Sequence, residues 1–326
     1  MTLIPVKKTH RRARHLPAWG MWGVCVSLAT FLTGCFTGIE STKKIELSRG
    51  DMKMTAPSPE KLYLDSILAA PLGQWDIGKR FLATDDRSSL MFLPRSLPHD
   101  TVKLGGKVLC YEGTETTLRP DGTEGLLLRL AADGHTYLYD TDKTPADARE
   151  TFTSDVMETF VDLDLVAALD HLMEGQTLYT RTPVWYDPQE KLMTGRKFVP
   201  VTVDSVTPGT LVFPVRVWFT DPERNVSAHM LMSLPRHTGA ASRRFQSLFL
   251  LSDLKKRYPG IDNEVWRLIQ EGKVRQGMTK EECRLSLGEP ADAYSGHNYA
   301  VRLDTWTYDG GRFLQFEDGL LVNFRI

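Results

Sequence analysis

The segment GMTKEECRLSLGEP, residues 277–290, determines the fold of the C-terminal part of the chain. Thr279 is a typical N-cap residue, and Glu282 three positions later completes a capping box, in which the cap residue contributes about 0.5–2 kcal/mol. Gly288 stands where a helix needs a left-handed residue at its C-terminal end, and Pro290 prevents the helix from continuing. The segment therefore predicts a short helix with two defined ends.

The residues on both sides of this helix predict its packing partners. A first helix is expected over Asn263–Glu271, because four apolar residues recur there with helical spacing and Gly272 follows them. Three strands with two glycine-containing turns between them are expected after the second helix. The strands contain Trp306 and Tyr308, then Phe313 and Phe316, then Leu320, Val322 and Phe324, and the turns are Asp309-Gly310-Gly311 and Asp318-Gly319. Residues 256–326 are thus predicted to form a helix-helix-three-strand antiparallel module.

Four short motifs occur in order within this module. Gly-Met-Thr-x-x-Glu, Leu-Gly-x-Pro, Trp-x-Tyr and Phe-x-Asp-Gly follow one another between Asn263 and Ile326. In this order they resemble the BamE/SmpA/OmlA-type domain of small bacterial lipoproteins, a family that assists outer-membrane protein assembly. The resemblance implies a fold, but proteins that share a fold need not share the chemistry of their sites. Two features depart from the family: about 200 residues of other structure precede the module, and Cys283 stands where the family has an aliphatic residue.

The region before the module is rich in short strand patterns. Runs of apolar or alternating residues are separated by turn residues, and Asp121-Gly122 and Asp133-Gly134 are hairpin dipeptides. Strands are expected at residues 79–84, 89–93, 107–111, 126–130, 135–139, 177–180, 197–203 and 210–220, and helices from Ser58 to about Pro71 and over Asp164–Glu174. Pro214 indicates an edge position or a bulge in the last strand. We therefore predict an α+β chain with small β-rich, barrel-like or sandwich domains at residues 58–150 and 151–255.

Two stretches of these domains look alike. The sequences GKRFL at residues 78–82 and GRKFV at residues 195–199 share a Gly-basic-basic-Phe pattern, and each follows a predicted helix that contains Leu-Asp. One interpretation is a single helix-plus-barrel unit used twice, whose strand pattern resembles small SH3-like barrels. The other interpretation is two unrelated β-rich domains, because the shared pattern is short.

The N-terminal segment has the three parts of an export signal. Five Lys and Arg residues lie between Lys7 and Arg14, an apolar run extends from Leu16 to Leu32, and Leu32-Thr33-Gly34-Cys35 ends the segment. These last four residues resemble the lipobox of bacterial lipoproteins. The resemblance implies that residues 1–34 are a removed signal peptide, that Cys35 carries diacylglycerol and palmitate-type acyl chains, and that residues 35–57 form a tether. Each buried methylene contributes about 0.8 kcal/mol, and two or more chains anchor a protein stably.

Two other interpretations of this segment fit less well. A transmembrane anchor needs about 20 predominantly apolar residues, and the run is shorter and contains Gly20 and Gly23. Arg11-Arg12 is compatible with a twin-arginine signal, but residues 13–16 match that pattern poorly. Phe36 follows Cys35 where many inner-membrane lipoproteins have Asp, which favours an anchor in the outer membrane.

Composition limits the classes of partner. Removing residues 1–34 removes five of the 40 Lys and Arg residues and none of the 41 Asp and Glu residues, so the formal net charge falls from −1 to −6. A mildly acidic chain lacks the excess of positive charge that is typical of nucleic-acid-binding proteins. The predicted partners are a membrane, reached through the lipid anchor, and envelope proteins, with a glycan as the alternative. Cys110 and Cys283 remain in a compartment that permits a disulfide, and the sequence leaves open whether they are bridged.

The sequence contains no catalytic, cofactor or metal signature. A Walker loop, a nucleophile elbow, His-Glu-x-x-His and a paired Cys-x-x-Cys are all absent. The stretch from Asp140 begins like a calcium loop, but Pro145 stands where the glycine belongs. Asp85-Asp86 is interpreted as a turn and Asp162-Leu163-Asp164 as a helix start. No catalytic residue, cofactor or metal ligand is therefore predicted, and Cys35, as the lipid attachment residue, is the one predicted site residue.

These observations favour a non-enzymatic cell-envelope lipoprotein that acts as a protein-binding or assembly platform. The alternative is a ligand-binding lipoprotein whose barrels recognise peptidoglycan or another glycan. An exposed cluster of Trp185, Tyr186 or Trp218 along a groove would support the alternative, because sugar rings stack on exposed aromatic faces. Burial of all three in a core would remove its only support in the sequence.

Overall fold

The computed structural model describes residues 57–326, apart from residues 66, 68, 99–101, 211, 235–242 and 299. The chain divides into two units, Met1–Thr55 and Ala56–Ile326, and all that follows concerns the second. The predicted signal peptide, Cys35 and all of the predicted tether except Pro57 lie outside the described residues. Within the described part of the chain, no helix has the length and hydropathy of a membrane span.

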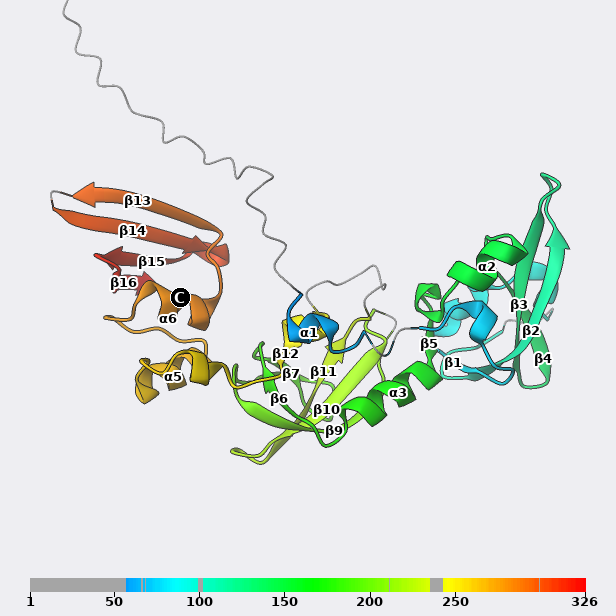
Figure 1. Ribbon diagram of the computed structural model, residues 1–326, viewed down its shortest axis with the longest axis horizontal. Helices are drawn as coiled ribbons and strands as arrows, with labels where there is room; N and C mark the ends of the chain where they lie inside the picture. Colours follow the sequence, from blue (N-terminus) through cyan, green and yellow to red (C-terminus); the bar gives the residue numbers. More distant parts are fainter. Residues whose placement is uncertain are drawn as a thin grey trace, which may run out of the picture. The chain divides into compact units, whose positions relative to one another are not determined.

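Five antiparallel strands form the first sheet, in the order β4-β3-β2-β1-β5 (Figure 1). They are β1 (Arg80–Ala83), β2 (Val108–Leu118), β3 (Glu124–Ala132), β4 (His135–Asp140) and β5 (Phe160–Asp162). The helical segments of this region are α2 (Pro145–Thr151) and the 3₁₀ turns η1 (Leu72–Gln74), η2 (Asp86–Met91), η3 (Pro94–Ser96) and η4 (Ser154–Val156). The predicted turn between β3 and β4 is confirmed, since Asp133 and Gly134 have φ values of 52° and 74°.

The strand predicted at residues 89–93 is wrong. Residues Asp86–Met91 form the 3₁₀ segment η2 instead. Asp85 caps this segment, because its carboxylate accepts a hydrogen bond from the Arg87 backbone N–H at 2.8 Å. Leu90 is exposed, so the apolar run Leu90-Met91-Phe92 does not pack as one buried strand face. The local side-chain cap outweighed the β-propensity of the run.

Seven strands form the second sheet, in the order β12-β6-β9-β10-β11-β7-β8. They are β6 (Thr177–Thr180), β7 (Val184–Tyr186), β8 (Leu192–Thr194), β9 (Pro200–Pro208), β10 (Val215–Asp221), β11 (Val226–Met232) and β12 (Phe249–Leu250). The accompanying helices are α1 (Pro59–Leu62), α3 (Leu163–Met173) and α4 (Phe245–Leu248). Helix α3 confirms the helix predicted at residues 164–174, and its Asp170 accepts a hydrogen bond from the Val206 N–H of β9 at 2.6 Å.

Two details of this region differ from expectation. Strand β10 lies inside the sheet, and Pro214 directly precedes it, where its missing N–H removes no ladder hydrogen bond. The bulge between β9 and β10 falls at Trp218 and Phe219 instead. The helix predicted from Ser58 begins there but is one turn long, Pro59–Leu62, and Tyr63 after it stacks on Phe245 with ring centroids 4.5 Å apart.

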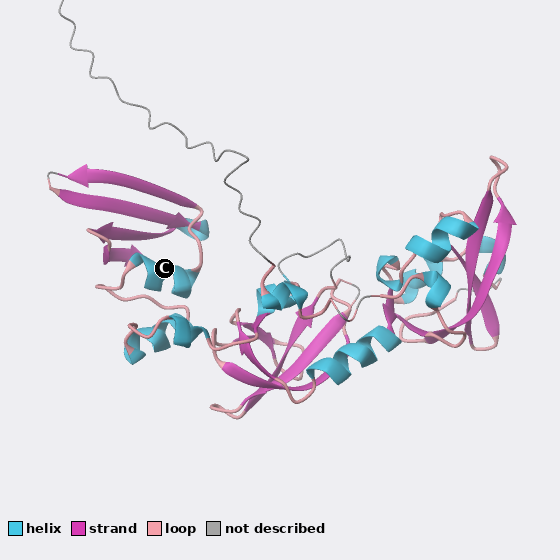
Figure 2. Cartoon of the chain, in the orientation of Figure 1, coloured by secondary structure: helices cyan, strands magenta, loops and turns pink. Residues whose placement is uncertain are grey.

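The structure is thus mixed α and β, rich in strands, with antiparallel sheets and a half-barrel (Figure 2). This confirms the coarse prediction of a mixed, strand-rich chain, whereas the division into small barrel-like or sandwich domains stays a prediction. The end strands of the two sheets described so far are β4 and β5 in one and β12 and β8 in the other, and Phe92 bridges to Tyr139 at the outer edge of β4. The domain boundaries at 150/151 and 255/256 and the repeat of one unit stay predictions.

The C-terminal region contains four strands rather than the three predicted. The 3₁₀ turn η6 (Leu254–Arg257) precedes helices α5 (Asn263–Gln270) and α6 (Lys280–Leu287), and the sheet is formed by β13 (Asp292–Asn298), β14 (Val301–Tyr308), β15 (Arg312–Glu317) and β16 (Leu320–Arg325), with η7 (Asp309–Gly311) between β14 and β15. The capping box of α6 is present: the Thr279 hydroxyl accepts from the Glu282 N–H at 3.3 Å, and the Glu282 carboxylate accepts from the Thr279 N–H at 2.7 Å.

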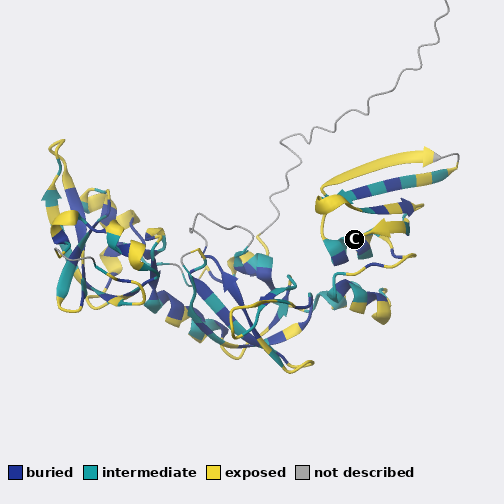
Figure 3. Ribbon diagram, turned by 180° about the vertical axis from the view of Figure 1, so that it is seen from behind, coloured by how far each residue is buried: buried dark blue, intermediate teal, exposed yellow. Residues whose placement is uncertain are grey.

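The additional strand, β13, has a sequence without apolar alternation. It reads Asp-Ala-Tyr-Ser-Gly-His-Asn and pairs with β14 from Asp292 opposite Thr307 to Asn298 opposite Val301. It is an edge strand, and residues 291–297 are all exposed (Figure 3). An edge strand held by backbone hydrogen bonds needs no buried face, so the alternation that marks the other strands is missing here.

Candidate binding surfaces

The three aromatic residues of the glycan alternative do not form one cluster. Trp185 is 2% exposed and belongs to the core of the second sheet, where its ring meets Phe219 edge-on with centroids 5.1 Å apart. Its indole N–H donates to the Thr182 carbonyl at 3.0 Å. Gly195 packs so closely on this indole that an added Cβ would lie 2.0 Å from the ring. Trp185 is therefore a packing residue with no free ring face.

Tyr186 and Trp218 lie on the opposite face of the second sheet, on either side of His229. Their ring centroids are 5.5 and 4.4 Å from the imidazole, which is 0% exposed. Both aromatic rings are half-buried. The imidazole thus fills the space between the two rings, whereas the glycan alternative needs exposed ring faces.

Charged side chains surround this aromatic cluster. Glu190 pairs with Arg216 at 2.6 Å and lies 3.4 Å from Nε2 of His229. Burial lowers the pKa of His229, and nearby Arg216 lowers it further, while Glu190 raises it. The Arg243 guanidinium stands over the Tyr186 ring, 5.9 Å from its centroid.

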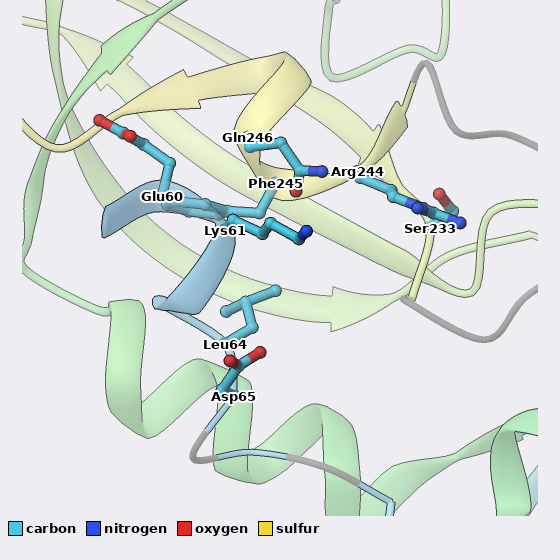
Figure 4. A pocket seen from close by; sticks show the side chains of 8 residues that line it. All are labelled: Glu60, Lys61, Leu64, Asp65, Ser233, Arg244, Phe245 and Gln246. Atoms are coloured by element: carbon cyan, nitrogen blue, oxygen red, sulfur yellow. The ribbon is translucent and has the colours of Figure 1, made fainter. Parts of the chain in front are cut away.

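A small pocket lies beside the first described helix. It is lined by residues from α1, the turn after it, the end of β11 and α4, and has a volume of about 130 Å³ (Figure 4). Its residues are Glu60, Lys61, Leu64, Asp65, Ser233, Arg244, Phe245 and Gln246. Glu60 accepts a hydrogen bond from the Leu251 N–H at 3.4 Å and thereby ties α1 to the strand β12. Pockets for drug-sized ligands measure about 300–1,000 Å³, so this pocket is smaller than that class.

A larger groove lies between the second sheet and helix α5. Its volume is about 470 Å³, within the range of ligand sites. Four cationic and two acidic side chains line it. The cationic residues are Arg196, Arg224, Lys255 and Arg267, and the acidic ones are Glu223 and Asp253. The groove therefore carries a cationic excess, in a chain whose predicted mature form is acidic.

Hydrogen bonds hold the two walls of the groove together. The Lys197 N–H donates to the Gln270 carbonyl at 2.9 Å, and the Gln270 amide donates to the Phe198 carbonyl at 3.4 Å. The rings of Phe198 and Trp266, whose centroids are 6.0 Å apart, close the floor. The side chain of Lys197 donates to the carbonyls of Leu285 and Ser286 at the C-terminal end of α6, where a cation is favourable.

Arg196 is the buried charge of this groove. It pairs with Asp221 at 2.7 Å and with Glu223 at 2.6 Å, and its side chain is 7% exposed. Burial lowers the pKa of Arg196, but the hydrogen bonds that its guanidinium donates to the two carboxylates outweigh burial and raise the pKa. Among the described residues, no partner is found for its Nε.

The carboxylates considered from the sequence have structural partners. Asp85 caps η2, and Asp162 caps α3, which confirms that the two pairs mark a turn and a helix start. Asp140 pairs with Arg119 at 3.1 Å. Among the described residues, no three His, Cys, Asp or Glu side chains come close enough together to hold a metal ion.

The described cysteines are both free thiols. Cys110 is half-buried, and Cys283 is buried in the core of the C-terminal region. Burial raises the pKa of Cys283 to about 12, with a smaller contribution from Glu282. Because the thiolate is the reactive form, Cys283 is a packing residue and not a nucleophile.

Comparison of the chain with known protein families, with curated proteins and with solved structures finds no match. The resemblances to a lipobox and to a BamE-type domain therefore rest on the motifs alone.

Proposed function

We propose that this protein is a non-enzymatic, lipid-anchored envelope lipoprotein that serves as a protein-binding or assembly platform. The observation that carries the proposal is the sequence Leu32-Thr33-Gly34-Cys35 behind a basic and an apolar segment. The BamE-type order of motifs in residues 263–326 supports an envelope role, and the outer membrane is the proposed location because Phe36 follows Cys35.

The non-enzymatic part of the proposal rests on the sequence and on the use of its carboxylates. No catalytic motif is present in the chain, and Asp85 and Asp162 serve as helix caps. The groove between the second sheet and α5 combines cations with aromatic side chains, which suits recognition of another molecule.

The glycan-binding alternative has weaker support. Of its three aromatic residues, Trp185 packs in a core, and Tyr186 and Trp218 pack against His229. The imidazole covers part of both rings and so reduces the aromatic surface on which a sugar ring could stack.

Metabolic labelling with an alkyne analogue of palmitate tests the anchor. Wild-type protein is expected to incorporate the label and to fractionate with the outer membrane. Cys35→Ala is expected to lose the label and to leave the membrane fraction, because no acyl chains remain to bury. Cys25→Ala is the matched control, since this cysteine lies in the predicted signal peptide, and it is expected to keep the label. Label that persists in Cys35→Ala contradicts the proposal.

In-cell cross-linking followed by affinity capture tests the platform role. Outer-membrane assembly proteins recovered with wild-type protein, and not with Cys35→Ala, are the expected result. Recovery of glycan fragments without a partner protein would favour the alternative.

A further inference from the structure

The groove between the second sheet and α5 contains cations that the protein itself does not neutralise. The Lys255 side chain donates to the neutral amide oxygen of Asn263. Among the described residues, neither Lys255 nor Arg267 has an acidic group within ion-pair distance, and Arg224 lies 3.9 Å from Glu271 in an exposed pair. By contrast, Glu223 is already paired with Arg196. Lys255 and Arg267 therefore remain available for a ligand, and Arg224 can exchange its long pair with Glu271 for a carboxylate of the ligand.

The lining also offers apolar surface beside these cations. Tyr179 and Pro200 are paired across β6 and β9 and border the groove, and the Trp266 ring forms part of its floor. A volume of about 470 Å³ is far larger than one carboxylate or phosphate group. The two acidic residues among the cations disfavour a densely charged polyanion, since like charges repel. A ligand with separated carboxylates and intervening apolar groups fits this mixture best.

We propose that the groove binds an extended, acidic segment of a partner protein. Carboxylates of the segment pair with Lys255, Arg267 and Arg224, and its apolar side chains lie against Tyr179 and Pro200. Arginine presents a planar fork that matches a carboxylate through two hydrogen bonds, which makes Arg224 and Arg267 suited to this task. Arg196 positions the wall through its pairs with Asp221 and Glu223.

This inference deepens the platform proposal, because it assigns the partner chemistry and the surface that recognises it. It depends on that proposal for the existence of a protein partner, whereas its test does not require the lipid. If Cys35 is not labelled while the groove binds acidic peptides, the lipid anchor is contradicted and the groove proposal is supported. If Cys35 is labelled while the groove does not prefer acidic peptides, the groove proposal is contradicted and the lipid anchor is supported.

A library of random dodecapeptides displayed on phage tests the charge preference of the full chain purified in detergent. The groove variant carries Lys255→Glu and Arg267→Glu. The matched control carries Lys256→Glu and Arg257→Glu, which change the charge equally at exposed positions that do not line the groove. We expect peptides rich in Asp and Glu to be enriched on wild-type and control protein, and this enrichment to disappear on the groove variant.

Fluorescence anisotropy with one selected, labelled peptide gives the size of the effect. The groove variant is expected to bind at least tenfold more weakly, and the control within twofold of wild type. Binding to wild type should weaken as salt is raised from 50 to 300 mM, because the cations are partly exposed. Arg267→Gln removes the charge while keeping a long polar side chain, and it should weaken peptide binding by about threefold. Because this change is mild, such a result would show that the weaker binding of the groove variant does not come from misfolding.

Three results would overturn the proposal. The first is a wild-type selection without acidic enrichment, and the second is equal binding by the groove variant and the control. The third is a groove variant that loses binding to vesicles containing phosphatidylglycerol while its binding of acidic peptides is unchanged, which would assign the cations to a lipid surface.

Discussion

Two buried aspartates, one beside the first sheet and one in the C-terminal sheet, stabilise their surroundings in different ways. Asp162 ends β5 and is 6% exposed. Its carboxylate accepts hydrogen bonds from the N–H groups of Asp164 and Leu165, at 3.1 and 3.0 Å, and pairs with Lys79 at 2.7 Å. It therefore caps α3 and binds a residue beside β1 at the same time.

Asp304 lies in the middle of β14 and is 3% exposed. It pairs with Lys280 of α6, accepts a hydrogen bond from the Ser295 hydroxyl of β13, and lies 3.2 Å from Arg302. None of these contacts caps a helix. Asp304 instead joins a helix and an edge strand to the centre of the sheet.

The comparison shows two ways of compensating a buried carboxylate. Burying a charge is costly unless it is paired and hydrogen-bonded, and both aspartates meet that requirement. Asp162 uses backbone groups two and three residues ahead, which its own helix provides. Asp304 depends mainly on elements that only the folded chain brings together.

The largest expected effect comes from breaking the first of these sites. Asp162→Ala removes the helix cap and leaves the mostly buried Lys79 without its main partner, so we expect a loss of about 3–5 kcal/mol in the free energy of unfolding. Urea denaturation measures the loss, and hydrogen exchange should locate it in α3 and β1.

Asp164→Ala is the control for this site. Asp164 lies in the same turn, pairs with the exposed Arg80 at 3.3 Å and is itself substantially exposed, so its loss should cost about 0–1 kcal/mol. Equal losses for the two variants would contradict the assignment of Asp162 as the stabilising carboxylate.

Asp304→Ala is expected to have a smaller effect, of about 2–3 kcal/mol. Its cationic partners reach solvent more readily, Arg302 having a side chain that is 57% exposed, so they regain hydration when the acid is removed. Faster hydrogen exchange should be confined to β13 and β14. Asp292→Ala, at an exposed position of β13, should leave the free energy of unfolding within about 0.5 kcal/mol of wild type. A loss as large as that of Asp304→Ala would contradict a specific stabilising role for Asp304.

The pH dependence sharpens the comparison further. Burial raises the pKa of Asp304, but the hydrogen bonds from Lys280 and Ser295 outweigh burial and hold the pKa below its ordinary value. The stabilisation is therefore present above the unfolded-state pKa of about 3.9 and is lost as pH falls through the folded-state value. Wild-type Tm should fall more steeply than that of Asp304→Asn between pH 5 and pH 2. Parallel plots of Tm against pH for the two proteins would show that the ionised Asp304 carboxylate does not contribute to stability.

Lys197 supplies the opposite case, a half-buried cation for which the described residues provide carbonyls rather than an acid. Burial lowers the pKa of Lys197 to about 8, against about 10.4 in an unfolded chain. Between these values the unfolded chain binds more protons than the folded one, so the contribution of Lys197 to stability rises with pH.

We expect the stability of wild type relative to Lys197→Met to increase by up to about 1 kcal/mol between pH 7.5 and pH 10. Urea denaturation at the two pH values measures the difference. Lys191→Met, at an exposed position, should show no such increase. A difference that decreases with pH would indicate that Lys197 remains charged throughout.

Local signals in the sequence predicted several elements correctly. Thr279 and Glu282 marked the start of α6, Asp162 marked the start of α3, and Asp133-Gly134 marked a hairpin turn. Each of these signals acts within about four residues, so its outcome depends little on the rest of the fold.

The two failures have separate causes. The strand predicted at residues 89–93 was lost to a side-chain cap, and β13 was missed because its edge position requires no apolar pattern. The groove has no motif of its own in the sequence. Arg196 and Phe198 belong to a Gly-basic-basic-Phe stretch, and no pattern marks Lys255 or Arg267.

The helix caps, the hairpin turns and the N-terminal motif that ends at Cys35 could be predicted from the chain alone, because they depend on residues that are neighbours along it. The burial of Asp304 between α6 and β13, and the placement of Arg196 and Arg267 along one groove, become visible only in the folded molecule. Those outcomes depend on pairing between elements that lie far apart in the sequence, where no local interaction specifies the contact.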